Sequence, residues 1–401
     1  MSEGQPSILY ASPMCTLDFT SGAAISIHAL LASLAARGFR AVALEAQLFD
    51  SPQGGALVEA AAQQAALAGH PVLQTTVLGV EHLMVRTVAR QRPDMTSREE
   101  EFYIDRYRKE LRHRRPDMVI LWGDLLLESV VMREARALGI PVVFYLASGG
   151  YQRKETFQDV SVIVTDTQAT ADLYKERLGL DCIPVGKFID PAMFKARERK
   201  PQYITFINPA PEKGVNVFMP LARLAAREAP DVKFLVVQGR GRWDAALKSL
   251  HCEPGDFPNV QVIEHQQNML PVYGATRALL VPSVWHESGG RVIVEALING
   301  IPVLASRSGG PPELVGQAGR IFDLPDEVRR NRDVPAAEAV VRPWLQEIER
   351  IWRDPVYYAG LTAKADEEAL KHDIGRNTER FLAAVQAATQ RRLGRGDQEE
   401  K

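Results

Sequence analysis

Apolar and polar positions along the chain follow two alternating patterns. Short, largely apolar runs, such as residues 7–10 (SILY) and 40–45 (RAVALE), are typical of strands buried on both faces. Between them, residues 25–38 (ISIHALLASLAARG) have the apolar spacing of a helix, and Gly38 ends it. A strand, a loop of small residues, a helix, a glycine and a second strand form the βαβ unit of a parallel sheet. The pattern therefore predicts an α/β fold.

The same unit recurs in two series that a charged stretch separates. The first series reaches residues 183–194 (IPVGKFIDPAMF) through strands at 118–123, 140–146 and 160–165. Residues 195–202 (KARERKPQ) lack periodicity and contain a proline, so we interpret them as a linker. The second series has a helix at 215–228, a helix that ends at Gly300, and strands at 202–209, 232–239, 260–265, 278–284 and 301–306.

Two successive series of this kind predict two Rossmann-like, doubly wound sheets with helices on both faces. We expect an N-terminal domain at residues 1–194 and a C-terminal domain at 195–370. In the closing segment, 371–401, a helix would return toward the first domain before a charged, solvated tail (391–401). Ligands bind beyond the carboxyl ends of the strands in such sheets. The two sheets would face a deep interdomain cleft, and each domain would bind one substrate.

Length, charge and cysteine content set the broad class of protein. The 401 residues suffice for two or three domains, and the net charge of −2 gives no indication of a nucleic-acid partner. Cys15, Cys182 and Cys252 lie far apart and form no metal or redox motif, which is typical of a reducing compartment. The sequence contains no signal-peptide pattern and no run of about 18 apolar residues. We therefore expect a cytoplasmic protein without stable membrane insertion.

The strongest chemical signal is the segment VPSVWHESGGRVIVEALING, in which a buried strand carries Glu287 at its carboxyl end. Ser288, Gly289 and Gly290 follow, and the glycines let the backbone approach a ligand closely. The helix that begins near Gly290 points its N-terminal N–H groups at the same place, an arrangement suited to phosphate. Glu295 lies in the second turn of this helix among apolar neighbours.

Two acids beside a phosphate site indicate sugar hydroxyls, because an ionised carboxylate only accepts hydrogen bonds and can take two from one diol. One acid for a ribose and one for a hexose, with a diphosphate between them, is a coherent pattern for a nucleotide sugar. The simpler interpretations are that Glu287 only complements the helix dipole and that Glu295 is a solvated helix residue.

At these residues the chain resembles the family 4 retaining glycosyltransferases (glycosyl transferases group 1), which have the GT-B fold. The resemblance rests on Glu287 and Glu295 with seven residues between them, and on the following GIPV, Gly309-Gly310 and Glu313. It continues upstream, where residues 208–214 (NPAPEKG) resemble the family's phosphate loop and residues 260–283 its base-binding strand and helix. It covers nearly the whole chain and is densest from about residue 183 to 319.

The resemblance implies a role for each matching residue. Lys213 would hold the diphosphate and Glu287 the transferred sugar, and these two form the expected catalytic pair. Glu295 would accept the ribose hydroxyls. The further donor-binding positions would be Ser288, Gly289, Gly290, Arg291, Asn208, Gly239, Glu264 and His265. The N-terminal loop under the phosphate and the acceptor would contain Ser21, Gly22 and Ala23.

The reaction implied by the resemblance moves a sugar from a UDP- or GDP-sugar to an acceptor with retention of the anomeric configuration. The leaving phosphate takes the proton of the acceptor hydroxyl on the same face, so catalysis rests on positioning and electrostatics. Because no Asp-x-Asp occurs, we expect a metal-independent enzyme without a metal site or cofactor. The acceptor is not indicated, since residues 47–115 match the family least.

Two positions depart from the family pattern. Relatives usually have an arginine a few residues before the lysine, where this chain has Asn208 and Pro209, so Arg291 or Arg240 would have to substitute. In the loop after residues 140–146, where relatives often carry a histidine, the chain has ASGG.

Other polar groups allow a functional and a structural interpretation. His286 could be a general base and His28 could face the acceptor, but a structural or packed histidine is the simpler interpretation of each. The basic stretch at 106–115 (RYRKELRHRR) could touch an anionic lipid or acceptor, and is more simply a solvated helix face.

Two other function classes remain open. Gly239-x-Gly241 lies between a strand and a helix, with Glu264 at the end of the next strand, which resembles the dinucleotide fingerprint of an NAD-dependent oxidoreductase. Asp244 takes the place of the third glycine of that fingerprint. The missing arginine and histidine are also compatible with a non-catalytic nucleotide-sugar-binding protein.

Overall fold

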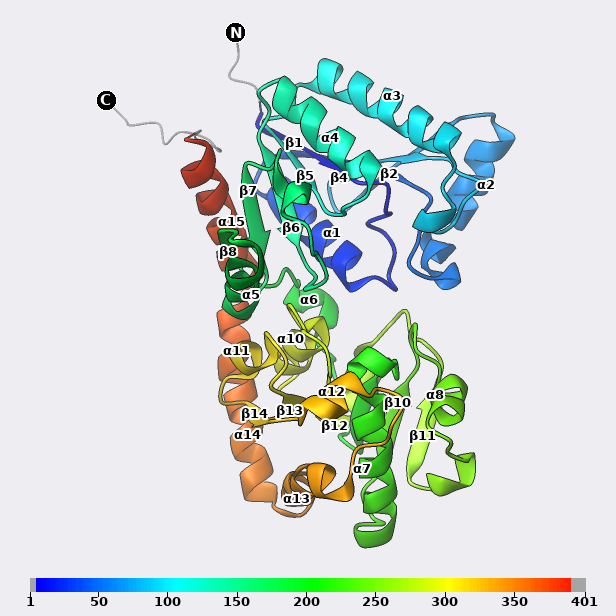
Figure 1. Ribbon diagram of the computed structural model, residues 1–401, viewed down its shortest axis with the longest axis vertical. Helices are drawn as coiled ribbons and strands as arrows, with labels where there is room; N and C mark the ends of the chain where they lie inside the picture. The colour runs from blue at the N-terminus through cyan, green and yellow to red at the C-terminus, as the bar shows by residue number, and fades with distance from the viewer. Residues whose placement is uncertain (1–4, 391–401) are drawn as a thin grey trace. The chain divides into compact units, whose positions relative to one another are not determined.

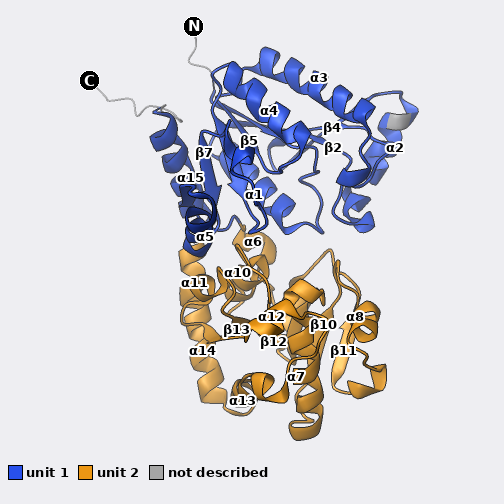
Figure 2. Cartoon of the chain, in the orientation of Figure 1, with its two compact units in different colours: residues 1–188, 374–401 blue, residues 189–373 orange. Residues whose placement is uncertain are grey.

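The computed structural model (Figure 1) describes residues 5–390 and divides into two compact units. Unit 1 comprises Met1–Phe188 and Ile374–Lys401, and unit 2 comprises Ile189–Asp373 (Figure 2). The solvated tail expected at 391–401 lies outside the described residues.

The described part of unit 1 contains one eight-stranded sheet with the order β3-β4-β2-β1-β5-β6-β7-β8. Neighbouring strands are parallel except β3 and β4. The strands are β1 (Ser7–Ala11), β2 (Arg40–Ala46), β3 (Val72–Val77), β4 (Val80–Val85), β5 (Met118–Leu121), β6 (Val142–Leu146), β7 (Val162–Thr165) and β8 (Cys182–Pro184).

Helices cover both faces of this sheet, because strand residues alternate between two apolar cores. One core joins Leu9 and Val42 to Tyr107 of α3 and Val131 of α4. The other joins Ile8 and Ala41 to α1 and α15. The helices of the unit are α1 (Gly22–Ala36), α2 (Glu59–Leu67), α3 (Ser97–Arg114), α4 (Leu126–Ala137), α5 (Gln168–Leu178) and α15 (Ile374–Thr389), with 3₁₀ turns η1 (Pro52–Leu57), η2 (Arg92–Asp94) and η3 (Lys154–Phe157).

Unit 2 contains a six-stranded, fully parallel sheet with the order β11-β10-β9-β12-β13-β14. Its strands are β9 (Tyr203–Ile207), β10 (Phe234–Val237), β11 (Val260–Ile263), β12 (Thr276–Val281), β13 (Val303–Ser306) and β14 (Gly319–Phe322). The order reverses at β9 and β12, and the loops beyond the carboxyl ends of these two strands are therefore the place where a ligand is expected.

The helices of unit 2 again form two layers. Phe218 of α7, Trp243 of α8 and Trp344 of α13 share one core, whereas α10 and α11 belong to the other. The helices are α6 (Pro191–Phe194), α7 (Val215–Glu228), α8 (Trp243–Ser249), α9 (Leu270–Ala275), α10 (Arg291–Ile298), α11 (Pro311–Val315), α12 (Asp326–Arg330), α13 (Glu338–Arg353) and α14 (Pro355–Ala369), with 3₁₀ turns η4 (Pro211–Lys213), η5 (Pro254–Asp256) and η6 (Leu370–His372). The helix predicted at 215–228 is confirmed as α7. The prediction of two α/β units with parallel sheets is confirmed as well.

The stretch interpreted as a linker belongs to unit 2. The N–H groups of Lys200 and Gln202 donate to the carbonyls of Gly274 (2.7 Å) and Ala275 (2.8 Å), and the N–H of Ala196 donates to Asn299 Oδ1 (2.7 Å). These bonds hold the stretch on the end of α9 and α10, so its lack of periodicity reflects an edge segment. The structure divides the units between Phe188 and Ile189 and again between Asp373 and Ile374, whereas the sequence placed these boundaries after residues 194 and 370.

Candidate functional site

Backbone contacts bring two loops of unit 2 together, although they are far apart in the sequence. Gly214, which follows η4, has a φ of 84°, and a Cβ there would lie 1.9 Å from the carbonyl oxygen of Pro282. The N–H of Val284 donates to the carbonyl of Glu212 (3.1 Å). Only a glycine permits both the positive φ and this close approach. The loop after β9 is thereby fixed against the loop after β12.

The loop after β13 is fixed to the same place by the backbone of Glu287. Its N–H donates to the carbonyl of Ser308 (2.7 Å), and its carbonyl accepts from the N–H of Gly310 (2.8 Å). Glu287 and Gly309 form an isolated parallel bridge. A Cβ on Gly309 would lie 2.8 Å from the ring of His286, so the second glycine pair makes room for this histidine.

The Glu287 carboxylate is the centre of a hydrogen-bond network. Its Oε2 accepts from Lys213 Nζ (2.7 Å). The same oxygen accepts from Ser283 Oγ and from Trp285 Nε1, both at 3.1 Å. Lys213 Nζ also lies 5.1 Å from the centre of the Trp285 ring, within cation–π range. Three donors, one of them the cation Lys213, thus converge on one carboxylate.

This network keeps Glu287 ionised. Burial by itself would raise the pKa of the carboxyl, but the charge of Lys213 and the hydrogen bonds from Lys213, Trp285 and Ser283 outweigh it and hold the pKa below its usual range. The side chain of Glu287 is 11% exposed and that of Lys213 is 21% exposed, so a molecule in the site can still reach both.

Glu295 lies deeper, at 4% exposure, and has two partners of its own. Arg291 Nε lies 2.5 Å from its Oε1, one helical turn away, and the hydroxyl of Tyr273 donates to its Oε2. The guanidinium of Arg291 rests on the ring of Phe194, at 4.6 Å from the ring centre. The buried charge that the sequence shows on α10 is therefore balanced by an arginine on the same helix.

The turn before α10 is built for backbone contact. Gly290 has a φ of 22° and precedes the first residue of the helix without a side-chain cap. Ser288, Gly289 and Gly290 are all buried. Glu287 lies four residues before the first residue of α10. The carboxylate is therefore close in sequence to the N-terminal N–H groups of this helix and to the positive end of its dipole.

Asn208 has a structural task. Its φ is 64°, and its Oδ1 accepts from the N–H of Gly241 (2.7 Å). A Cβ on Gly241 would lie 2.3 Å from the backbone nitrogen of Ala210, and a Cβ on Gly239 would lie 3.1 Å from the side chain of Asn208. Packing of the β10 loop against the β9 loop thus requires the glycine at 241 and leaves little room for a side chain at 239.

Glu264 is an exposed residue at the end of β11. Its carboxylate accepts from Arg242 (2.6 Å) and from Gln238 Nε2 (2.8 Å), and the hydrogen bond from Arg242 lowers its pKa. His265 follows it directly in the chain. These residues and the 239–241 turn follow the neighbouring strands β11 and β10 at the carboxyl edge of the sheet.

The N-terminal loop named in the sequence belongs to unit 1. Ser21 caps α1 through its Oγ, which accepts from the N–H of Ala24 (3.5 Å), and a Cβ on Gly22 would have open space around it. The buried carboxylate of Asp18 accepts from Thr20 Oγ1 (2.6 Å) and from the N–H of Asp50 (2.7 Å), which fixes the loop before Ser21. Ala23 follows in the first turn of α1.

His28 is a packed histidine, in agreement with the simpler interpretation. Its ring stacks on His82 at 5.2 Å, and burial lowers its pKa to about 4. His82 Nδ1 in turn lies 3.0 Å from the buried carboxylate of Glu45, which also accepts from the N–H of Thr16 (2.7 Å).

The basic stretch at 106–115 lies on α3 and at its end, where part of its charge is used internally. Arg106 and Arg114 both pair with Glu110, and Arg114 also pairs with Glu81 of β4.

The loop after β6 is held by α5, because Tyr174 donates to the carbonyl of Ser148 (2.7 Å).

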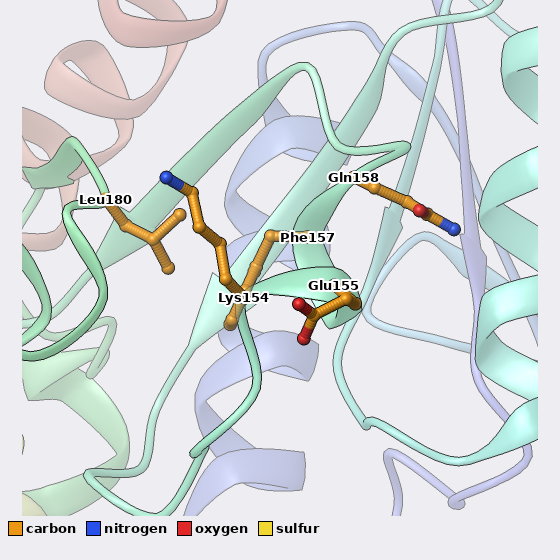
Figure 3. Close-up of a pocket in the computed structure, with 5 residues that line it drawn as sticks. All are labelled: Lys154, Glu155, Phe157, Gln158 and Leu180. Carbon is orange, nitrogen blue, oxygen red and sulfur yellow. The ribbon is translucent and has the colours of Figure 1, made fainter.

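A pocket elsewhere in unit 1 involves none of the residues predicted from the sequence. It has a volume of about 280 Å³ and is lined by Lys154, Glu155, Phe157, Gln158 and Leu180 (Figure 3).

Among residues 5–390, no group of three or more His, Cys, Asp or Glu side chains is arranged to hold a metal ion. In the same part of the chain, no helix is both long and apolar enough to span a membrane.

Sequence reasoning missed three polar side chains of the site: Ser283 and Trp285, which bind Glu287, and Tyr273, which binds Glu295. Ser283 and Trp285 lie in the loop between β12 and Glu287, four and two residues before it, and this closeness in the sequence was the available signal. Tyr273 lies on a short helix ahead of β12, and nothing in its local sequence indicates a bond to Glu295.

Comparison with known proteins gives one sequence match and many structural ones. Residues 201–331 match the family model described as "Glycosyl transferases group 1". No curated protein sequence matches the chain.

The chain is similar in structure to sucrose-phosphate synthase from Thermosynechococcus elongatus, with a TM-score of 0.70 and 15% identity over 96% of this chain and 100% of the other. A glycosyltransferase from Rickettsia africae gives a TM-score of 0.68 and 12% identity over 96% and 99%. The HepE protein from Anabaena, solved with UDP and glucose, gives 0.64 and 15% over 96% and 99%. With the two parallel-sheet units, these similarities show that the fold is GT-B.

Proposed function

The chain carries a glycosyl transferases group 1 domain at residues 201–331, and on this premise we propose that it transfers a sugar from a nucleotide sugar to an acceptor with retention of the anomeric configuration. A UDP-sugar is the first donor to test, because HepE was solved with UDP and with UDP-glucose. The acceptor would meet the loop of Ser21, Gly22 and Ala23 in unit 1.

The observation that supports this proposal best is the pairing of each acid of the motif with its own cation. Lys213 neutralises Glu287, and Arg291 neutralises Glu295. A diphosphate that binds at the N-terminus of α10 would otherwise meet two bare carboxylates. With both acids balanced, the helix dipole and the N–H groups give the site a net attraction for anions. This arrangement supports Arg291 as the substitute for the arginine that is missing near Asn208.

In the proposed reaction each group has a separate task. The ionised Glu287 accepts hydrogen bonds from hydroxyls of the transferred sugar, and Glu295 accepts those of the ribose. Lys213 and the N–H groups after Gly289 stabilise the negative charge that grows on the leaving diphosphate. A phosphate oxygen takes the proton of the attacking acceptor hydroxyl, while the bond from the anomeric carbon to the diphosphate breaks and the new glycosidic bond forms on the same face.

The wall for the base would be formed by Gly239, Glu264 and His265, with Asn208 shaping it through Gly241. Because Lys213 and Arg291 balance the two acids and the helix N-terminus attracts anions, we propose that transfer needs neither a metal ion nor a cofactor. Activity that is retained after EDTA treatment and absent only without Lys213 would support this part of the proposal.

A donor screen tests the function directly. The protein is incubated with UDP-, GDP- and ADP-sugars and with NAD, while thermal stability and nucleotide release are recorded. A donor at about 100 times its Kd should stabilise the protein by about 2.7 kcal/mol. Stabilisation by NAD alone would favour an oxidoreductase and refute the proposal. Stabilisation by a nucleotide sugar without release for any acceptor would favour the non-catalytic alternative.

Two variants test the assignment of the acids. We expect Glu295→Gln to weaken donor binding by about 10- to 100-fold, the value of one charged hydrogen bond. Glu287→Ala should lower turnover more than it weakens nucleotide binding. Glu338→Gln, on the exposed side of α13, serves as the control. Full donor affinity and activity in both site variants would show that the acids have no role.

A further inference from the structure

The orientation of Glu295 is set by a buried tyrosine. Tyr273 is fully buried, and its hydroxyl donates to Oε2 of Glu295, while Arg291 Nε lies at Oε1. A carboxylate has about four lone-pair directions, two on each oxygen. Two partners therefore do not exhaust its capacity to accept hydrogen bonds. The two oxygens, held in one fixed plane, suit the two neighbouring hydroxyls of a ribose.

Both partners are themselves held in place. The N–H of Tyr273 donates to the carbonyl of Met269 (3.0 Å), and the next residue is Gly274, where a Cβ would lie 2.9 Å from the carbonyl oxygen of Glu198. The short helix α9 is thereby fixed against the segment that leads into β9, so the Tyr273 ring has a defined direction toward α10.

The arginine side is equally well supported. Asn299 Nδ2 donates to the carbonyls of Glu295 (2.8 Å) and Phe194 (2.7 Å), which ties α10 to α6. The ring of Phe194 then carries the guanidinium of Arg291. Rotation of the Glu295 carboxylate would break the bonds to Tyr273 and Arg291 together. A site that is held in this way loses little conformational freedom when a ligand binds.

We propose that Tyr273 is a positioning residue that fixes the Glu295 carboxylate for the ribose hydroxyls and so makes the site prefer ribonucleotides over 2′-deoxyribonucleotides. The proposal rests on the donor site assigned under the proposed function and adds to it the residue that sets its selectivity for the sugar of the nucleotide. If the Tyr273 ring only filled space, a phenylalanine could replace it. Here, however, the hydroxyl is the group in contact with Glu295.

The test compares the affinities of UDP, GDP and ADP with those of their 2′-deoxy forms by isothermal titration. In the wild type, the preferred ribonucleotide should bind about tenfold more tightly than its 2′-deoxy form, as one hydrogen bond to a charged group predicts. In Tyr273→Phe, the affinity for the ribonucleotide should fall about tenfold, and that for the 2′-deoxy form, which keeps only the 3′-hydroxyl, should fall less. The preference would then narrow.

Tyr357→Phe is the matched control, because the hydroxyl of Tyr357 also donates to a carboxylate of unit 2, that of Glu347 between α13 and α14. It should leave the preference unchanged. In a Glu295→Gln background, Tyr273→Phe should have no additional effect on the ratio, since the carboxylate on which it acts is gone. If Tyr273→Phe does not fold, Arg291→Lys tests the same ratio from the other oxygen.

The outcomes separate the two levels of the argument. If Tyr273→Phe weakens the ribo and deoxy forms equally, or changes neither, Tyr273 has no positioning role and the proposed function stands. If the wild type binds none of the six nucleotides, the proposed function itself fails, and the positioning role falls with it.

Discussion

Replacement of Lys213 by methionine should lower the free energy of unfolding, because it leaves the buried carboxylate of Glu287 without its cation. The substitution removes the ammonium that lies 2.7 Å from Oε2 and keeps most of the aliphatic stem. Ser283 and Trp285 remain as donors to the same oxygen, but neither carries a charge. The variant therefore leaves a carboxylate of 11% exposure with hydrogen bonds and without a counter-charge.

The expected loss of stability lies between two limits. Removal of one partner of a buried ion pair costs about 3–5 kcal/mol, whereas an exposed pair contributes about 0.2–1 kcal/mol. Lys213 is 21% exposed and two neutral donors remain, so we expect about 2–3 kcal/mol, near the value of one charged hydrogen bond. For a unit of this size, the midpoint of thermal unfolding should fall by roughly 4–12 °C at pH 7.

The penalty should depend on pH. In the wild type the folded-state pKa of Glu287 is lowered, so its stabilising contribution is present above the unfolded-state pKa of about 4.3 and is lost as the pH falls through the folded-state value. Without Lys213, burial dominates and the folded-state pKa rises, so the folded variant can neutralise the carboxyl by taking up a proton. The difference between wild type and variant should therefore shrink between about pH 7 and pH 4.

Urea unfolding at several pH values, followed by tryptophan fluorescence and circular dichroism, measures this difference for unit 2. Lys175→Met is the control, because Lys175 Nζ also lies 2.7 Å from a carboxylate, that of Asp181, but the two side chains are 62% and 87% exposed. The double variant Lys213→Met/Glu287→Gln should be more stable than Lys213→Met alone, since it no longer buries an unpaired charge at position 287. Equal, pH-independent effects of Lys213→Met and Lys175→Met would refute the reasoning.

Two further variants test other parts of the structure. His28→Phe keeps a ring against His82 and removes a titrating group whose folded-state pKa is about 4. Since the unfolded state takes up a proton near pH 6.5 and the folded state does not, wild-type stability should fall between about pH 6.5 and pH 4, and chemical unfolding should show a flatter dependence in the variant. Asn208→Gly and Asn208→Ala both lose the bond to the N–H of Gly241, but of these two residues only glycine adopts the φ of 64° without strain. Unfolding in urea should therefore find the alanine variant less stable than the glycine variant by about 1–2 kcal/mol, and equal stabilities would contradict a strained backbone at this position.

The repeated units of the fold are predictable, because each strand and helix has a recognisable pattern within a short stretch of sequence. Buried parallel strands give continuous apolar runs, and glycines such as Gly38 and Gly300, both with positive φ, end the helices that precede them. The antiparallel β3–β4 hairpin gave no such signal. Its two-residue turn has positive φ at both Leu78 (48°) and Gly79 (80°), and leucine is an unusual residue at the first of these positions.

The site was predictable only in part, and for a related reason. Glu287, the glycine pair and Glu295 lie in one short segment of the chain. Their positions relative to one another therefore follow from the turn and the helix, and their spacing in the sequence was informative. The contact between Lys213 and Glu287 depends on the fit of Gly214 against Pro282, and the contact of Tyr273 with Glu295 depends on where α9 packs. Such contacts are properties of the folded unit, and a linear pattern does not contain them.

Unit 1 is built from two distant segments of the chain, and this has a consequence for its synthesis. The ring of Phe381 and the side chain of Val385 on α15 complete the core that also contains Val164 and Phe188. Unit 2 is continuous in sequence and lies between these segments, so a ribosome finishes it before α15 emerges. Until then, we expect one face of the unit 1 sheet to stay partly uncovered, although most of the residues of unit 1 are made first. We therefore expect the core of unit 2 to close before that of unit 1, although the synthesis of unit 1 begins first.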